Sequence, residues 1–309
     1  MANMQIIIPG ALPPSPVATE LIGHLEKACP ELVACFNSMS ATRIEMPVET
    51  LGCTPYEAVM LRQLGYQGDL GHKIGAGLAP LRAGATQNED SVLIAELCNI
   101  DIGTNGAQIT HPATLNISQD EADALFDAVS GLWEGSSLSI LPVGLNRWRV
   151  WISNMDAFDS ISPHALHGLA LRDWLPQDEF LKPWRRLLNE IQTVWHDHPV
   201  NQARADRQEL PVNSLWLYGG ARGWKPNRSD HASMVFEDLL LPHALEDWAA
   251  WLKAMPRLTE FLRQAPTQVD MTLLGDQHAI ELAPINRAWW QRLWPARQQN
   301  WKSWWNLQS

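Results

Sequence analysis

The chain has 309 residues, of which 46% are hydrophobic, and it carries 23 Lys and Arg against 34 Asp and Glu, a formal net charge of −11. This length allows one large domain or two ordinary ones, and the hydrophobic fraction is typical of a globular protein. Nucleic acid and anionic membranes attract clustered basic residues, whereas these are scattered and outnumbered, so we expect neither as a partner. An anionic small molecule could still bind in a locally positive pocket.

The N-terminal stretch MANMQIIIPGALPPSP has no basic region before its apolar run, which Pro9 interrupts. No run approaches the roughly 18 apolar residues that cross a bilayer. We therefore expect a cytoplasmic protein without a signal peptide. The four cysteines are irregularly spaced and form no C-x-x-C pair, which favours buried free thiols over a zinc site or disulfides. They are Cys29, Cys35, Cys53 and Cys98.

In the first third of the chain, residues 5–8 (QIII) predict a short strand that runs into a proline-rich turn. Residues 17–29 and 55–64 have the apolar spacing of amphipathic helices, and Thr54-Pro55 is a favourable helix start. The glycine-rich stretch 65–84 predicts a flexible loop. It contains G-A-G at 75–77 but no third glycine three residues later, so it does not match the dinucleotide-binding pattern.

Farther along, the patterns alternate between strands and helices. Apolar runs or alternation predict strands at 91–100, 147–153 and 214–218, and a hairpin about Gly275-Asp276. Ser118 and Glu121 form a capping box before a helical pattern that extends to residue 133. This alternation predicts an α/β fold with a mixed sheet flanked by helices.

The C-terminal stretch AWWQRLWPARQQNWKSWWNLQS is rich in tryptophan. Trp290, Trp294, Trp301 and Trp305 would lie on nearly one helical stripe, although Pro295 must kink or split the helix. We expect this stripe to dock onto the protein's own core, and a partner-binding surface is the alternative.

Residues 184–198 predict an amphipathic helix with two stripes. At about 100° per residue, one stripe is apolar and should be buried: Trp184, Leu188, Ile191 and Trp195, with Leu187 and Val194 close behind. The neighbouring stripe is polar and consists of Arg185, Asn189, Gln192 and His196. All four polar side chains carry donors, so they could bind an oxyanion, or they could form an ordinary solvated helix edge.

The tripeptide Pro-Val-Asn then occurs twice, at 199–201 and 211–213, on either side of the charged segment QARADRQE. Each proline ends the preceding element, because the residue before a proline is disfavoured in the α region. Both asparagines would thus stand at rigid corners near the strand 214–218. Two corners bracketing a surface excursion would explain the repeat, and so would two amides positioned for a ligand.

A glycine-rich turn follows this strand. Backbone N–H groups of Gly219-Gly220-Ala221-Arg222-Gly223 could bind an anion, with Arg222 and Lys225 adding positive charge, or the residues could form only a tight turn. The spacing differs from that of a Walker A loop.

These residues carry a resemblance. The motif HPVNQARADRQELPVNSLWLYGG, with Leu175-Pro176 and WRRLLNEIQ (184–192) before it, resembles short bacterial proteins called RpfE-type regulatory proteins. It is more distantly similar to archaeal-type cofactor-independent phosphoglycerate mutases of the alkaline phosphatase superfamily. The resemblance covers about residues 88–224, which we predict to form a mutase-like α/β core, with 1–87 and 225–309 as flanking segments that could pack together as a second lobe.

The resemblance implies the fold of these mutases, but several residues that their reaction needs are not recognisable in this chain. The mutases use two divalent metals, a Ser or Thr nucleophile, and clustered Asp and His ligands. In this chain no Asp-Gly follows the first strand, and Asp276 and His278 do not form the clustered motif, so the metal clamp for phosphoryl transfer is not recognisable. His164 and His167, three residues apart, come nearest to a metal-binding pair.

We therefore expect a non-catalytic regulatory or ligand-binding protein without a cofactor, whose partner is an anionic small molecule or another protein. The alternatives are a phosphoglycerate mutase or phosphoesterase that uses Mn or Zn, and a protein–protein interaction module built on the Trp-rich C-terminus. The predicted ligand-facing or structurally fixed residues are Asn189, Gln192, His198, Asn201, Arg204, Asn213, Gly219, Gly220 and Arg222.

Overall fold

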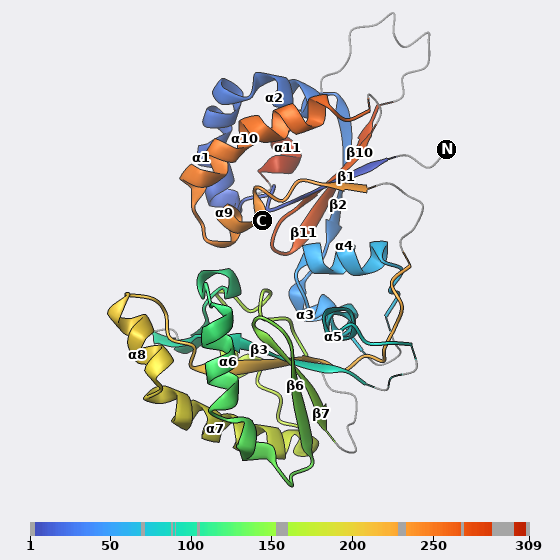
Figure 1. The fold of residues 1–309 in the computed structure, drawn as a ribbon. Helices are drawn as coiled ribbons and strands as arrows, with labels where there is room; N and C mark the ends of the chain where they lie inside the picture. Colours follow the sequence, from blue (N-terminus) through green and yellow to red (C-terminus); the bar gives the residue numbers. More distant parts are fainter. Residues whose placement is uncertain are drawn as a thin grey trace, which may run out of the picture. The chain divides into compact units, whose positions relative to one another are not determined.

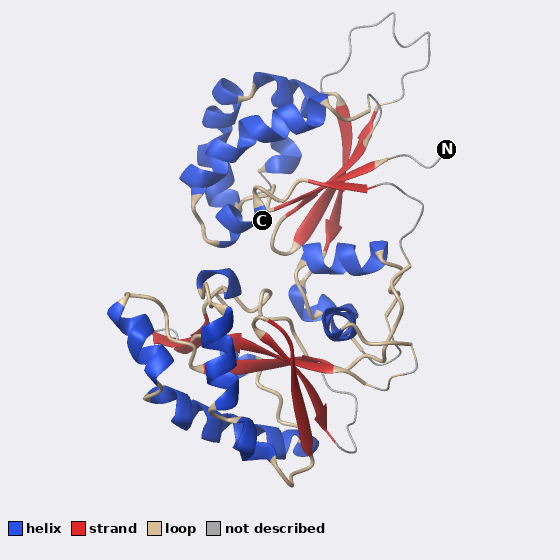
Figure 2. Cartoon of the chain, viewed as in Figure 1, coloured by secondary structure: helices blue, strands red, loops and turns tan. Residues whose placement is uncertain are grey.

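The structure, a computed structural model, describes residues 4–68, 72–87, 89, 91–103, 106–152, 160–227, 233–266, 269–285 and 300–306. It divides into two compact units. Unit 1 comprises residues 1–47 and 228–309, and unit 2 comprises residues 48–227. The predicted α/β class with a mixed sheet flanked by helices is confirmed, and Figure 2 distinguishes helices from strands.

Unit 1 contains the mixed sheet, whose strand order is β2-β11-β10-β1-β9. Its strands are β1 (Gln5–Pro9), β2 (Met39–Glu45), β9 (Ser233–Val235), β10 (Asp270–Leu274) and β11 (His278–Pro284). Strand β1 is parallel to both β9 and β10, whereas β11 is antiparallel to β10 and to β2. The first strand and the hairpin about Gly275-Asp276 are thus as predicted. Both ends of the chain contribute strands to this one sheet (Figure 1).

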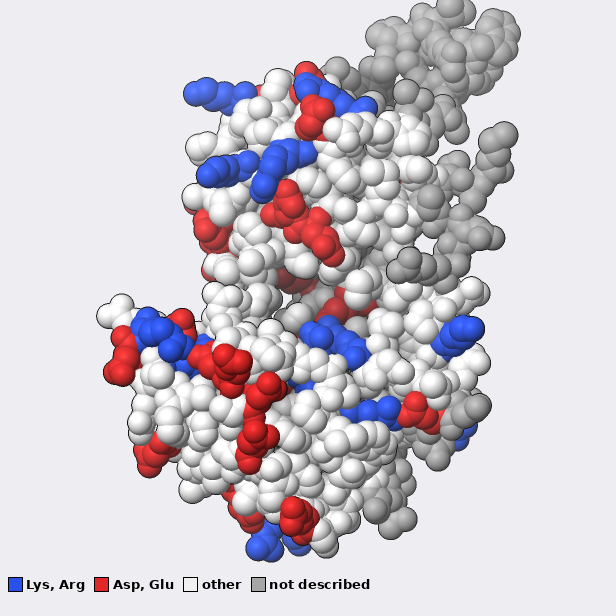
Figure 3. Space-filling view, in the orientation of Figure 1, with Lys and Arg blue, Asp and Glu red and all other residues white. Residues whose placement is uncertain are grey.

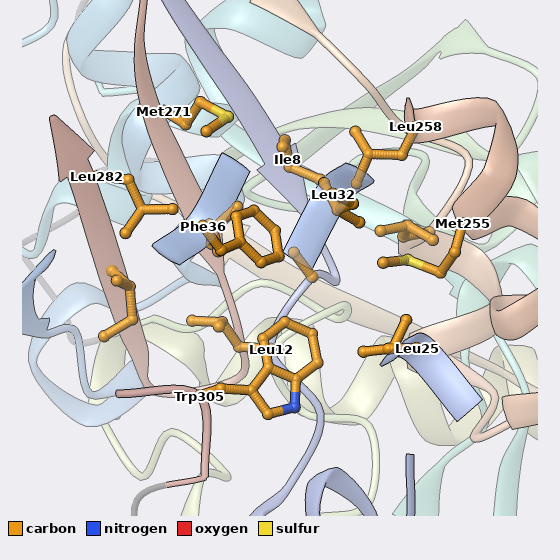
Figure 4. Packing of buried hydrophobic residues seen from close by; sticks show 14 of the residues in the cluster. Ile8, Leu12, Leu25, Leu32, Phe36, Met255, Leu258, Met271, Leu282 and Trp305 are labelled. Carbon is orange, nitrogen blue, oxygen red and sulfur yellow. The ribbon is translucent and has the colours of Figure 1, made fainter. Parts of the chain in front are cut away.

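Helices of unit 1 pack on one face of this sheet (Figure 1). They are α1 (Ser15–Ala28), α2 (Pro30–Asn37), α9 (Leu240–Ala244), α10 (Trp248–Arg263) and α11 (Lys302–Trp305). The core between helices and sheet contains Phe36, Met255 and Trp305 (Figure 4). The C-terminal tryptophans that the structure describes, Trp301, Trp304 and Trp305, are buried there, as the docking interpretation expects. Trp290 and Trp294 lie outside the described residues.

Unit 2 contains a four-stranded antiparallel sheet of order β6-β7-β3-β8 and a separate hairpin of β4 and β5. The sheet strands are β3 (Leu93–Cys98), β6 (Leu138–Gly144), β7 (Arg147–Ile152) and β8 (Ser214–Gly219), and the hairpin strands are β4 (Ile100–Gly103) and β5 (Gly106–Ile109). Three of the sheet strands, β3, β7 and β8, were predicted.

One face of this sheet carries the apolar core of unit 2, against α6 (Gln119–Asp127) and α7 (Lys182–His196). Trp195 illustrates the packing, because its ring lies edge-on to Trp148 and its Nε1 donates to Leu125 O at 3.0 Å. The buried residues of α7 are Trp184, Leu187, Ile191 and Trp195, which confirms the apolar stripe except that Leu188 is only partly buried and Val194 is exposed. Helix α8 (Pro199–Asp206) follows, with the 3₁₀ helices η3 (Ser130–Trp133), η4 (Leu171–Asp173) and η5 (Glu179–Leu181) elsewhere in the unit.

The remaining elements of unit 2 are α3 (Val48–Leu51), α4 (Pro55–Gln63), α5 (Leu78–Ala83) and the 3₁₀ helices η1 (Ile74–Gly77) and η2 (Pro112–Thr114). Residues 48–87, which we grouped with the flanking segments, therefore pack within unit 2. Arg82 of α5 links this segment to the sheet, because its Nη1 donates to the Tyr218 hydroxyl of β8 at 2.8 Å while its Nη2 pairs with Glu57 of α4 at 2.6 Å.

The prediction of a loop over 65–84 is wrong for residues 74–83, which form η1 and α5. The glycines here allow close packing. A Cβ on Gly75 would lie 2.2 Å from Gly52 O, and a Cβ on Gly77 would lie 2.4 Å from the Tyr66 ring. Residues 69–71 of this stretch lie outside the described residues.

On the face drawn in Figure 3, basic and acidic residues are interspersed within each unit. All four cysteines are free, and three of them are buried while Cys35 is half-buried. Within the described part of the chain, every helix is too short or too polar to span a lipid bilayer.

Candidate functional site

The two asparagines of the repeated Pro-Val-Asn bond to backbone. Asn201 is buried, and its Nδ2 donates to Trp195 O (2.8 Å) and Val212 O (2.9 Å), while its Oδ1 accepts from Val212 N–H (2.9 Å). Asn213 accepts from Ile100 N–H at 2.8 Å and donates to Ile100 O at 2.9 Å. Each amide therefore ties a proline corner to a neighbouring segment, which explains why the tripeptide occurs twice.

Arg204 holds the same corner from inside the unit. Its side chain is fully buried, with Nε donating to Leu210 O at 2.7 Å and Nη1 to Glu121 Oε2 at 2.8 Å. Its Nη2 donates to Leu115 O. All three guanidinium nitrogens thus bind the chain itself, and Arg204 joins α8 to the start of α6.

The remaining polar residues of this region lie along α7 and at the start of α8. Gln192 Nε2 donates to the Ser214 hydroxyl at 2.9 Å, and Asn189 is exposed on the same helix. His198 caps α8, since its Nδ1 accepts from Val200 N–H at 3.2 Å. Arg185 donates to two backbone carbonyls, Pro176 O and Asp178 O, and His196 is 84% exposed. The polar stripe therefore does not converge on one point.

The glycine turn after β8 also uses its backbone groups internally. The N–H groups of Gly219, Gly220 and Gly223 donate to Ser160 Oγ (3.1 Å), Val92 O (2.7 Å) and Glu89 O (2.9 Å). Gly219 has a φ of +109°, and a Cβ there would lie 2.2 Å from the Ala79 Cβ. Arg222 is exposed. These three N–H groups are thus engaged by the chain, which favours the tight-turn interpretation over an anion-binding loop.

A buried ionic network lies on the other face of the unit 2 sheet. Arg82 Nη2 pairs with Glu57 Oε1 at 2.6 Å, and Arg82 Nη1 donates to the Tyr218 hydroxyl. The Tyr218 hydroxyl donates to Glu96 Oε2 at 2.8 Å, which Arg147 Nε also contacts at 3.2 Å. Burial and the Glu96 charge raise the pKa of Tyr218 well above its ordinary value. The network therefore places two buried carboxylates, Glu57 and Glu96, beside arginine side chains.

Three histidines gather at the Glu57 end of this network, and we call them the imidazole cluster: His111, His164 and His167. The ring of His111 stacks on that of His164 and lies edge-on to that of His167, with centroid distances of 5.4 Å in both cases. His164 Nδ1 lies 3.7 Å from Glu57 Oε1, and its side chain is 30% exposed. His167 is exposed. The cluster thus leads from a buried carboxylate to the surface of unit 2.

Glu57 is ionised despite its burial. Burial alone would raise its pKa, but the charges of His164 and Arg82 and hydrogen bonds from Ser162 and Thr54 outweigh burial and lower the pKa to about 2. The Ser162 hydroxyl donates to Glu57 Oε2 at 2.6 Å. The same carboxylate closes the capping box with Thr54 at the start of α4. The Glu57 carboxylate therefore both caps α4 and lies beside His164 of the cluster.

His111 is held in one tautomer. Its Nδ1 accepts from Ala113 N–H at 3.3 Å, so a neutral ring carries its proton on Nε2. Burial, followed by the charges of His164 and His167, lowers the pKa of His111 to about 4. At neutral pH the cluster thus contains a neutral imidazole with an Nε2–H donor.

Sequence reasoning noted only the pair His164 and His167. Glu57, His111 and His164 are far apart in the chain, and no spacing rule relates them. The sequence did hold one signal for the position of His111. The dipeptide His111-Pro112 also occurs as His198-Pro199, and both histidines cap the following helix through Nδ1. Among the residues that the structure describes, no group of three or more His, Cys, Asp or Glu is arranged to hold a metal ion.

Comparisons with known proteins give a distant relationship. No protein-family profile matches the chain. It is 29% identical over 105 residues to a probable 2,3-bisphosphoglycerate-independent phosphoglycerate mutase of Geobacter sulfurreducens, a match that covers 34% of this chain and 26% of that protein. It is 28% identical over 156 residues to the corresponding mutase of Methanosarcina mazei, covering 49% of this chain and 38% of that protein. The matches thus span well under half the length of these relatives.

Among solved structures, the PH0037 protein from Pyrococcus horikoshii has a TM-score of 0.45 and 13% identity over 92% of this chain and 88% of that one. A cofactor-independent phosphoglycerate mutase from Thermoplasma acidophilum has a TM-score of 0.34 and 16% identity, over 93% and 91%. The chain is distantly similar in sequence to cofactor-independent phosphoglycerate mutases.

Proposed function

We propose that the chain is a non-catalytic, ligand-binding regulatory protein of the cytoplasm, related to cofactor-independent phosphoglycerate mutases and of the RpfE type, and that it binds a small anionic metabolite at the imidazole cluster. The observation that carries this proposal is the gathering of three imidazoles at the partly exposed end of a buried charge network. The predicted residues around α7 and α8 then have a different role, since their polar atoms brace the fold that holds the cluster.

The chemistry of the cluster suits recognition of an oxyanion. Imidazole N–H groups donate to phosphate or carboxylate oxygens, and a ring that is protonated adds charge to the hydrogen bond. Glu57 and Arg82 fix the inner end, because their pair at 2.6 Å is buried and cannot rearrange cheaply. A prepositioned site of this kind loses little side-chain entropy on binding.

The test uses 3-phosphoglycerate and thermal unfolding of the full chain in the presence of EDTA. A ligand that binds only the native state stabilises it by about 2.7 kcal/mol at 100 times its Kd, so a rise in Tm is expected. His167→Gln and His111→Asn should reduce the rise, and Asn retains the helix cap at position 111. The exposed His196→Gln serves as the matched control and should respond like the wild type. If the Tm does not rise at any 3-phosphoglycerate concentration up to about 100 times a typical metabolite Kd, the proposal is wrong.

The same samples address the other two functions. Interconversion of 2- and 3-phosphoglycerate that requires added Mn²⁺ or Zn²⁺ and stops with EDTA would establish the metal-dependent enzyme in its place. Absence of both activity and ligand response, with self-association in ultracentrifugation, would favour the protein–protein interaction module.

A further inference from the structure

We propose that the imidazole cluster takes up a proton together with its anion, so that anion binding by this chain is a response to acidification. This inference rests on the proposed function and adds a regulation to it. It is carried by the position of Glu57 directly behind His164, with Nδ1 and Oε1 3.7 Å apart.

The first step concerns charge. Near neutral pH the inner end of the cluster is balanced, because the Glu57 carboxylate is paired with the Arg82 guanidinium. Arg82 is also bound to Tyr218 and lies 3.8 Å from Glu96, so its positive charge is already neutralised by carboxylates of the chain. An anion among neutral rings would then meet the nearby carboxylate, and like charges at such distances repel each other.

The second step is the effect of a proton on His164. An imidazolium there would lie between two negative groups, Glu57 behind it and the anion in front, and would attract both. Proton uptake and anion binding are thus coupled thermodynamically, since each makes the other more favourable. Neither partner alone gains both contacts.

His111 is the ring of the cluster that remains neutral. His111 lends its Nδ1 to the Ala113 N–H, so protonation at that atom would break the cap of η2. Its ring also faces both other imidazoles, and a second charge in this space is unfavourable. His111 therefore contributes a neutral Nε2–H donor, while His164 carries the proton.

The charged and titratable groups near the cluster lie on four segments of unit 2. The segment 160–169 carries His164, His167 and Ser162, α4 carries Glu57, and α5 carries Arg82. Helix η4, which packs beside β5, carries Arg172 and Asp173, which pair with each other at 3.4 Å and are 86% and 64% exposed. These solvent-exposed charges offset each other, so the Glu57–His164 pair dominates the electrostatics of the site.

The experiment measures sulfate binding to the full chain between about pH 8 and about pH 5.5 at constant ionic strength. Sulfate is the probe because it keeps its charge throughout this range, unlike phosphate esters. Coupling to one proton predicts that the Kd falls by up to about tenfold per pH unit. Isothermal titration in two buffers of different ionisation enthalpy should show close to one proton taken up per sulfate.

Two variants assign the effect. His164→Gln should lose most of the pH dependence of the Kd, and His196→Gln should retain it. A sulfate Kd that does not change with pH, or a dependence that His164→Gln leaves intact, would overturn the proton coupling but leave the ligand-binding function standing. Failure of both sulfate and 3-phosphoglycerate to bind at any pH would instead overturn the proposed function, and with it this inference.

Discussion

At the scale of single residues, Asn201 shows how one amide can replace a stretch of regular backbone pairing. It makes three buried hydrogen bonds of 2.8–2.9 Å. One is to Trp195 near the end of α7, and two are to Val212 at the proline corner before β8. Removing the amide leaves the carbonyls of Trp195 and Val212 and the N–H of Val212 without that partner. Buried groups that lose a partner bear the full desolvation cost.

Asn201→Ala is therefore expected to lower the free energy of unfolding by about 2–3 kcal/mol. Urea denaturation followed by circular dichroism measures this change. Gln202→Ala on the same helix is the control, because its exposed amide donates only to Asp197 O, and the loss should stay below about 0.5 kcal/mol. Equal effects of both substitutions would show that Asn201 is not a brace.

Glu57 gives a prediction on pH. Its pKa in the folded chain is about 2, below the ordinary 4.5, because His164, Arg82 and two hydrogen bonds outweigh its burial. A depressed carboxyl pKa contributes stability that is complete above about pH 4.5 and is lost as the pH falls toward about 2. The contribution is on the order of 3 kcal/mol.

Glu57→Gln should therefore flatten the acid side of the stability profile between about pH 4.5 and about pH 2, while glutamine still completes the capping box. Unfolding free energies from urea titrations across this range provide the measurement. Glu190→Gln, on an exposed i,i+4 pair, should keep the wild-type profile. A steep acid limb that persists in Glu57→Gln would contradict this role.

At the scale of elements, local signals were sufficient for several helices. The Thr54-Pro55 helix start and the capping box of Ser118 and Glu121 are recognised from neighbouring residues, and α7 has an apolar repeat that any helical projection reveals. Helix α5 was missed because its evidence is not local. The glycines before it look like a flexible loop, and only the structure shows Gly52 and Tyr66 packed against them.

The candidate site was harder to predict for the same reason. The polar residues around 189–222 form a dense motif, which drew attention to them, yet their side chains and backbone mostly bind the chain itself. The imidazole cluster and Glu57 come from three separate segments of unit 2, and no regular spacing in the sequence predicts that they meet. The polar residues that are dense in the sequence thus mostly brace the fold, whereas the candidate site consists of residues that only the fold brings together.

Helix α11 offers a prediction at this scale. Trp305 packs within 5.4–6.3 Å (ring centroids) of Trp301, Trp251 and Phe36 and lies in the core of unit 1 (Figure 4). Trp305→Ala should destabilise unit 1 by about 3–5 kcal/mol, measured by urea unfolding. Lys302→Ala, which removes only a half-exposed pair with Glu26, should cost less than about 1 kcal/mol. Unchanged stability with altered self-association would instead assign Trp305 to a partner surface.

At the scale of the whole molecule, the chain order explains why the two units depend on each other unequally. Unit 2 is one continuous stretch, and its sheet partners and its apolar core all come from within residues 48–227. Unit 1 is divided, because β1 and β2 come from the first 47 residues whereas β9, β10 and β11 come after residue 227. Strand β1, which lies between β10 and β9, pairs only with strands that follow residue 227.

This asymmetry predicts that residues 48–227 fold alone and that residues 1–47 do not. The isolated stretch 48–227 should give a cooperative urea transition and dispersed amide resonances, since it retains its own core. In a chain ending at residue 227, β1 loses β9 and β10 and β2 loses β11, so their backbone groups and apolar side chains lose their cover. Limited proteolysis should then remove residues 1–47 and stop near residue 48. Protection of 1–47 in the truncated chain, or an unfolded 48–227, would show that the two units are not organised as the strand pairing implies.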